Sequence, residues 1–174
     1  GEQTGSKIGV FTVENKISPP MTWRWPVNGW TGWQNTTTCV GSATAACTAY
    51  GPVLETGYGV YGSKLTESSG SSTRSTVTKT FTAASGERWN TLTFSGLLSP
   101  SAEDSYSRSL IINVNGLIVY SATAEEDPAI NGQQFTLTRT FSPANAVTVM
   151  ITTKQDPIIG TDYNTLQFNS LTLK

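Results

Sequence analysis

Alternation of threonine with bulky apolar residues is the feature of this sequence that most narrows the folds open to it. Threonine stands at every second position of residues 76–82 (TVTKTFT) and 135–141 (FTLTRTF), with bulky apolar residues at most of the positions between, and the same period recurs at 91–94 and 147–152. Successive side chains of a strand point to opposite faces of a sheet, so this pattern predicts strands with one buried and one solvated face. Because no segment shows a convincing helical spacing, the chain is predicted to be all-β.

Turn residues locate further strands. Asn115-Gly116 separates the apolar runs 110–114 and 117–120, and Asn-Gly is the preferred pair for a type I′ hairpin turn. In the last expected strand, 166–173, the apolar positions shift phase between Phe168 and Leu171, which predicts a bulge. Residues 7–13 indicate another strand. At least eight short strands without a repeat or a linker predict one domain over residues 1–174, a β-sandwich of two antiparallel sheets and of the jelly-roll type.

The composition excludes several classes of function. The net charge is −1 and the charged residues make up only 13% of the chain, with no run rich in lysine or arginine. We therefore expect no nucleic-acid partner. No apolar run approaches the roughly 18 residues that a membrane-spanning helix needs, so no membrane span is expected.

Catalytic chemistry has few candidates. The chain has no histidine, which removes histidine-based triads and histidine metal sites. A glycosidase needs two carboxylates, but most of the 12 Asp and Glu residues fall in loops, and none lies in apolar sequence that would raise its pKa. A non-catalytic protein is therefore the prediction. Oxygen ligands for calcium could come from 125–127 with Asn131, or from Asp156, Asp162 and Asn164.

The two cysteines, Cys39 and Cys47, bracket a loop of small residues. We predict a disulfide, which would stabilise the fold by roughly 2–3 kcal/mol in the chain-entropy model; the alternative is two free thiols. A local cysteine pair on a chain with a polar surface suits an oxidising compartment, so a secreted or cell-surface location is expected.

Tryptophan is concentrated near the start of the chain, where four of the 5 lie between Trp23 and Trp33. Aromatic rings stack on the apolar C–H face of a sugar, while Asn, Gln and Arg supply directional hydrogen bonds. The alternative is that some of these rings belong to the core. Arg139, in phase with inward-facing neighbours, either lies at a sheet edge with its head in water or points into a cleft. The predicted ligand-binding residues are Trp25, Asn28, Trp30, Trp33, Gln34, Tyr58, Tyr61 and Arg139.

Several short motifs together resemble the galactose-binding-like jelly rolls, which include carbohydrate-binding modules attached to glycoside hydrolases. The resemblance spans most of the chain. It is carried by residues 13–15 (VEN), 28–33 (NGWTGW), 57–59 (GYG), 80–86 (TFTAASG) and 113–116 (NVNG), and by Asn169 in the last strand.

This resemblance implies a jelly-roll fold and a site for sugars on the concave sheet face or in the loops at one end. It also implies a structural calcium ion, although Asn169 stands where the family often has an acidic ligand. The predicted metal ligands are Glu14, Glu126, Asp127 and Asn169.

Three functions remain in competition. The first is a carbohydrate-binding module or lectin whose partner is a polysaccharide or glycan. The second is a structural or adhesive subunit of a fibre, pilus or phage appendage, a homo-oligomer or filament in which residues 7–13 pair with a neighbour's open edge by strand addition. The third is a lyase or hydrolase built on a jelly roll. The repeated Thr-x-Thr faces also suggest an ice-binding plane, but threonine favours strands in any case.

Overall fold

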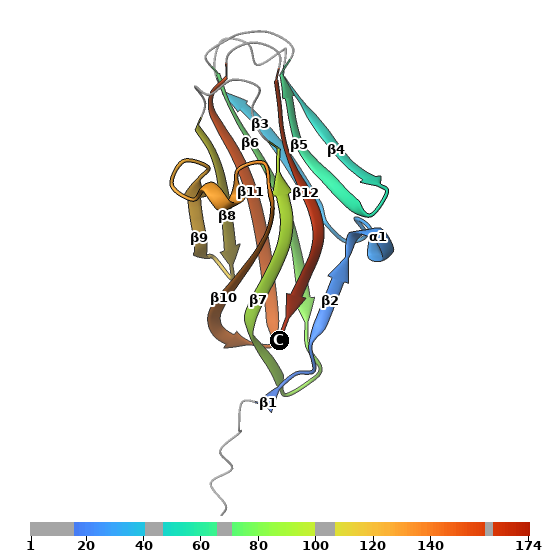
Figure 1. The fold of residues 1–174 in the computed structure, drawn as a ribbon. Helices are drawn as coiled ribbons and strands as arrows, with labels where there is room; N and C mark the ends of the chain where they lie inside the picture. Colours follow the sequence, from blue (N-terminus) through green and yellow to red (C-terminus); the bar gives the residue numbers. More distant parts are fainter. Residues whose placement is uncertain (1–15, 41–46, 66–70, 100–106, 159–161) are drawn as a thin grey trace, which may run out of the picture.

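The computed structural model describes residues 16–40, 47–65, 71–99, 107–158 and 162–174, and these form two β-sheets packed face to face (Figure 1). The predicted all-β sandwich is therefore confirmed. Helix is confined, in this part of the chain, to α1 (Trp25–Asn28) and the 3₁₀ turn η2 (Pro128–Ile130). No described helix is both long enough and apolar enough to cross a membrane. The strand expected at 7–13 lies outside the described residues.

The first sheet has seven strands and is antiparallel except at β1, which runs parallel to β7. Its main order is β1-β7-β12-β5-β4, while β10 pairs with β7 and β2 pairs with the end of β12. The strands are β1 (Lys16–Ile17), β2 (Met21–Arg24), β4 (Cys47–Glu55), β5 (Tyr58–Leu65), β7 (Glu87–Leu98), β10 (Gln134–Ala144) and β12 (Asp162–Leu173).

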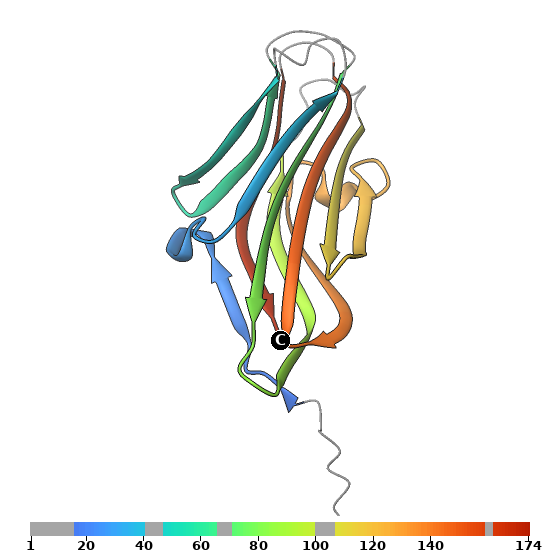
Figure 2. The ribbon, with the colours of Figure 1, turned by 180° about the vertical axis from the view of Figure 1, so that it is seen from behind.

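The second sheet has five strands in the order β3-β6-β11-β8-β9, all antiparallel, and faces the viewer in Figure 2. Asn115 and Gly116, which join β8 to β9, have φ values of 51° and 84°. A type I′ turn needs positive φ at both central positions, so the predicted hairpin is confirmed. The strands are β3 (Gln34–Val40), β6 (Ser71–Thr82), β8 (Ser107–Val114), β9 (Leu117–Thr123) and β11 (Ala146–Ile158).

The alternating pattern separates the core from the surface as predicted. Apolar residues of β6, β11 and β8 face those of β7 and β12, and Val77, Leu92 and Ile112 have no exposed surface. The threonines between them point outward and pair across strands, as in the hydroxyl contact between Thr80 and Thr148 at 2.8 Å. The predicted bulge in β12 is also present, because its register with β7 shifts between Phe168 and Ser170.

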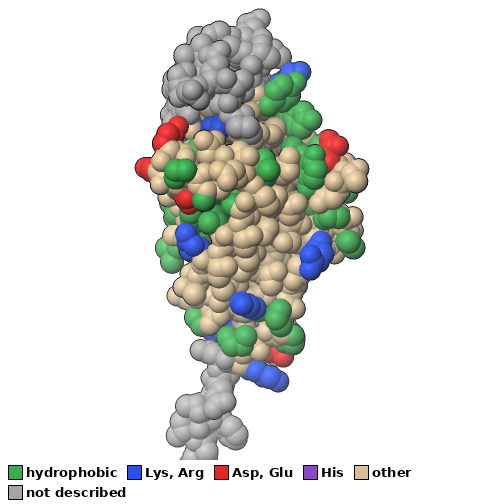
Figure 3. Space-filling model, viewed as in Figure 1, with side chains coloured by type: hydrophobic (Ala, Val, Ile, Leu, Met, Phe, Trp, Pro, Cys, Tyr) green, Lys and Arg blue, Asp and Glu red, His purple; other side chains and the backbone are tan. Residues whose placement is uncertain are grey.

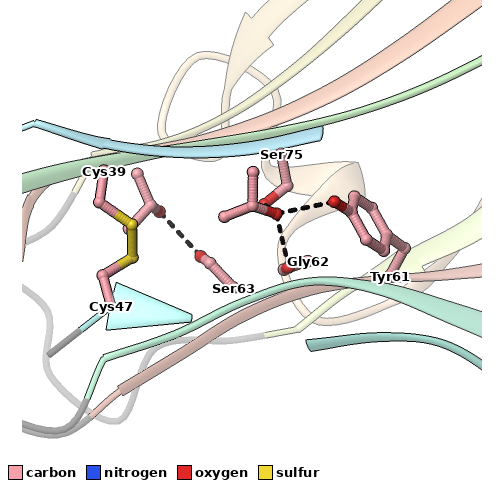
Figure 4. Close-up of a disulfide and its surroundings, with 8 residues drawn as sticks. Cys39, Cys47, Tyr61, Gly62, Ser63 and Ser75 are labelled. Carbon is pink, nitrogen blue, oxygen red and sulfur yellow. Dashed lines mark hydrogen bonds between the residues drawn. A yellow bond between two sulfur atoms is a disulfide. The ribbon is translucent and has the colours of Figure 1, made fainter. Parts of the chain in front are cut away.

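One end of the sandwich has a polar interior (Figure 4). The Thr37 hydroxyl lies 2.8 Å from the Tyr61 hydroxyl and 2.9 Å from that of Ser75, and Ser63 donates to Thr73 at 2.9 Å. Beside them the predicted disulfide joins Cys39 in β3 to Cys47 in β4, and so links one sheet to the other. Hydrogen bonds and a covalent link therefore hold the sheets together where apolar side chains are few.

Candidate functional site

The tryptophan-rich segment turns inward. Pro26 stands in the first turn of α1, where its missing N–H costs no hydrogen bond within the helix. This turn places Trp25, with no exposed surface, against Phe168 and Phe94 at centroid distances of 5.1 and 6.5 Å. Trp33, 8% exposed, packs 5.3 Å from Trp25. These two rings belong to the core and offer no open face to a sugar.

The other two tryptophans of the segment are half-buried. The Trp23 indole donates to the Gly29 carbonyl at 3.0 Å, and Lys79 lies over its ring with Nζ 4.7 Å from the centroid. Trp30 donates to the Val53 carbonyl at 2.8 Å and contacts Phe168 at 4.9 Å. Both side chains therefore serve mainly to fasten the segment to the sandwich.

Three of the hydrogen-bonding residues in the predicted set come from different elements. Asn28 is exposed, and its Oδ1 accepts a hydrogen bond from the Arg24 amide at 2.7 Å, so it braces the short helix. Gln34 is exposed at the start of β3. Tyr61 is only 2% exposed, and this burial raises the pKa of its phenol. Because Tyr61 is buried, it cannot form one exposed surface with the other two side chains.

Of the predicted calcium ligands, Glu126 and Asp127 are neighbours in the turn after β9, whereas Asn169 lies in β12. Glu126 accepts from the Thr123 amide at 2.9 Å, Asp127 accepts from the Tyr120 hydroxyl at 2.7 Å, and Asn169 accepts from Gln134 at 2.9 Å. Glu14 lies outside the described residues. No group of three Asp, Glu or Cys side chains in the described ranges is placed to hold a metal, and calcium binding stays a prediction.

Aromatic side chains are exposed elsewhere, on the outer face of β4, β5 and β12. Figure 3 shows hydrophobic side chains at the upper right, over these strands, beside an otherwise polar face. They surround a hollow of about 260 Å³. We call this hollow the tyrosine site; its lining residues are Tyr50, Glu55, Tyr58, Val60, Tyr163, Thr165 and Gln167.

The register of the strands explains how the tyrosine site forms. Thr165 and Gln167 alternate along β12 with the buried Leu166 and Phe168, so they point away from the core. Val60 pairs with Gln167 across β5 and is 6% exposed, although it lies outside the core cluster. It forms an apolar floor on the outer face.

Two rings form the wall of the tyrosine site. Tyr50 and Tyr163 meet edge to face, with centroids 5.6 Å apart and an interplanar angle of 86°. Tyr163 is 42% exposed, and the Lys64 ammonium lies 5.3 Å from its ring centroid. The arrangement offers an exposed aromatic edge, a carboxylate from Glu55 and an amide from Gln167 within one hollow. Of the predicted residues it includes only Tyr58.

Comparison with known proteins concerns the fold. The carbohydrate-binding module TmCBM27, described for specific mannan recognition, matches with a TM-score of 0.50 and 13% identity over 88% of this chain and 94% of that module. TmCBM61, solved with β-1,4-galactotriose, matches with a TM-score of 0.44 and 6% identity, over 86% and 92% of the two chains. A family 11 module from Clostridium thermocellum gives 0.41 and 10%, over 90% and 95%.

No family model matches the sequence, and no curated protein matches it either. The match to TmCBM27 covers nearly the whole of both chains. The protein therefore has the jelly-roll fold of carbohydrate-binding modules, and the predicted resemblance to such domains is confirmed at the level of fold. A fold hosts many functions, so the site must decide the function.

Proposed function

We propose that this protein is a non-catalytic carbohydrate-binding module that binds a polysaccharide through the tyrosine site. The observation that carries the proposal is the exposed edge-to-face pair of Tyr50 and Tyr163 above a hollow that also holds Glu55 and Gln167. Tyrosine supplies a flat apolar ring for the C–H face of a pyranose and a hydroxyl for hydrogen bonding. Carboxylate and amide groups supply the planar acceptors and donors that sugar hydroxyls need.

The placement of the site supports binding to an extended chain. The hollow is shallow and lies on strands rather than in a closed pocket. Its neighbours on the same face are hydroxyl-bearing side chains, including Ser95 and Thr136, which contact each other at 2.9 Å. A polymer lying on this face would meet aromatic rings at the hollow and hydroxyl groups beyond it. The disulfide suits a secreted protein, because disulfides persist in oxidising compartments. A module that binds an extracellular polymer would have to be secreted.

The test is isothermal titration calorimetry of the wild type and of Tyr163→Ala against mannan, mixed-linkage β-glucan, galactan and xylan. We expect one of these neutral polymers to bind, and Tyr163→Ala to weaken binding about tenfold or more, which corresponds to about 1.4 kcal/mol. Tyr163→Phe keeps the ring and removes only the hydroxyl, so it separates stacking from hydrogen bonding.

The matched control is Thr80→Ala, which removes an exposed hydroxyl from β6 in the other sheet, away from the hollow. It should leave the dissociation constant unchanged if the tyrosine site binds the sugar. Binding by the wild type that persists undiminished in both Tyr163→Ala and Tyr50→Ala would contradict this location. If none of the four polymers binds the folded wild type, the choice of neutral polysaccharide is rejected.

The second candidate function is a structural subunit that assembles with copies of itself. Two strands that end their sheets, β9 and β10, pair on one side only among the described strands, and Leu117 and Ile118 beside them are 70% and 63% exposed. Open edges with apolar neighbours are sites of strand addition. Size-exclusion chromatography over a range of protein concentrations tests this function, since a monomer at every concentration would exclude it.

A further inference from the structure

A second hollow lies on the flank of the sandwich, between the β8–β9 hairpin and β10. We call it the flank groove. Its volume is about 500 Å³, within the range of ligand sites in proteins. One wall carries Leu117 and Ile118, and the other carries Thr140, Phe141 and Ser142. Figure 3 shows hydrophobic side chains and a basic one on the left flank, where β9 and β10 run in Figure 1.

Arg139 supplies the charge of the flank groove. Its guanidinium carbon lies 5.1 Å from the centroid of the Tyr120 ring, and Nη1 donates to the Thr138 carbonyl at 2.8 Å. The far end of the same ring is fixed, because the Tyr120 hydroxyl donates to Asp127 at 2.7 Å. The guanidinium is thus held in place by a ring and a carbonyl.

Arg139 forms no ion pair within the described ranges, since the nearby carboxylate of Asp127 is bonded to the far end of the Tyr120 ring. Its guanidinium keeps N–H groups that the single bond to Thr138 does not use. A guanidinium has five N–H donors in a planar fork, which fits the two oxygens of a carboxylate. Apolar and aromatic groups alongside such a fork suit an anion with an apolar face. This combination differs from that of the tyrosine site, where Glu55 would repel an anion.

We propose that the flank groove binds a carboxylate-bearing sugar unit, a uronic acid, with its carboxylate on Arg139 and its ring against Phe141. Thr140 and Ser142, both exposed, lie beside it to hydrogen-bond the sugar hydroxyls. The inference rests on the proposed glycan-binding function and adds a second site with the opposite charge preference. A chain that contains both neutral and acidic sugars would offer a ligand to each site.

The test uses tetragalacturonate and its fully methyl-esterified form as probes in isothermal titration calorimetry. The wild type should bind the acid, bind it more weakly at high salt, and fail to bind the ester, which cannot form the charged hydrogen bonds. Arg139→Gln should weaken binding of the acid at least tenfold. Arg139→Lys keeps the charge without the planar fork and should fall between the two. This second variant keeps the test decisive if Arg139→Gln unfolds in a thermal melt.

The matched control is Arg24→Gln, which removes the same charge from an exposed position on β2, in another part of the fold. It should bind tetragalacturonate like the wild type, and so should Tyr163→Ala. Tyr163→Ala should affect the neutral polymers alone, so failure of the tyrosine site and failure of the flank groove give different results.

Equal binding of acid and ester, no loss in Arg139→Gln, or no binding of the acid would overturn the proposal. Dimers that Arg139→Gln abolishes, in the absence of binding, would assign the groove to self-association instead.

Discussion

Removal of the Cys39–Cys47 disulfide should lower the stability of the sandwich by about 2.5 kcal/mol. The two cysteines are separated by 8 positions and their Cα atoms lie 6.2 Å apart. Closing so short a loop removes little entropy from the unfolded chain, which keeps the expected effect at the low end of the range for disulfides. With the entropy of unfolding expected for a domain of this size, the loss corresponds to about 7 °C in melting temperature.

The position of the disulfide makes this loss measurable. The bond joins the two sheets at the end where Thr37, Ser63 and Thr73 replace apolar side chains in the interior. Hydrogen bonds there contribute only about 1 kcal/mol each, since the unfolded chain bonds to water instead. The disulfide is therefore expected to contribute more than any one of the hydrogen bonds that join the two sheets at this end.

The assay is urea unfolding, followed by tryptophan fluorescence, of the wild type and of the double variant Cys39→Ala/Cys47→Ala, with and without a reducing agent. The wild type should lose about 2.5 kcal/mol on reduction, and the double variant should not respond to reduction at all. Identical unfolding midpoints for oxidised and reduced wild type would refute the reasoning, because the cross-link would then not restrict the unfolded chain.

Three further changes test the core and the polar end. Phe168→Ala removes a ring that is 2% exposed and should cost about 3–5 kcal/mol in urea unfolding. Thr37→Val should cost about 1–3 kcal/mol in the same assay, because it leaves the buried Tyr61 hydroxyl without its 2.8 Å partner. The pKa of Tyr120 is raised from its ordinary 10.0 by burial and by its hydrogen bond to Asp127. The folded protein thus keeps this proton while the unfolded chain releases it, so stability should fall as the pH rises above about 10. Tyr120→Phe should flatten that fall in urea midpoints measured against pH, and an unchanged slope would show that Tyr120 does not cause it.

Much of the fold could be predicted because its signals are local. The alternation at 135–141 lies in β10, and Asn115-Gly116 forms the expected turn. Phe168 and Leu171 both face the core because a bulge at Asn169 restores the phase. Strands β3, β4 and β5 were harder to predict, since in them glycine, threonine and small residues replace the apolar alternation. Their pairing comes from tertiary contacts.

The candidate site was much less predictable. Tryptophan density pointed to residues 23–33, where Trp25 and Trp33 are in fact buried. Tyr50 and Tyr163 are far apart in the sequence and meet because β4 and β12 both pair with β5. The available signal was the alternation of Tyr163, Thr165 and Gln167 with buried residues, which marks them as one outward face.

The division between tryptophan inside and tyrosine outside has a physical cause. An indole has a large apolar area and only one N–H, so the free energy gained by burying the ring exceeds the cost of an unpaired N–H. Trp25 and Trp33 are examples, since no group in the described structure accepts their indole N–H. A phenol at the surface keeps its hydroxyl in water while the ring stays available to a ligand. Tyr61 is buried away from water, and its hydroxyl is instead paired with that of Thr37 at 2.8 Å. The number of aromatic residues is therefore a poor guide to which rings are exposed in such a sandwich. Strand phase is a better guide, because a ring on a strand faces outward where the residues at the intervening positions are in the core, as Tyr163 does beside Asn164 and Leu166.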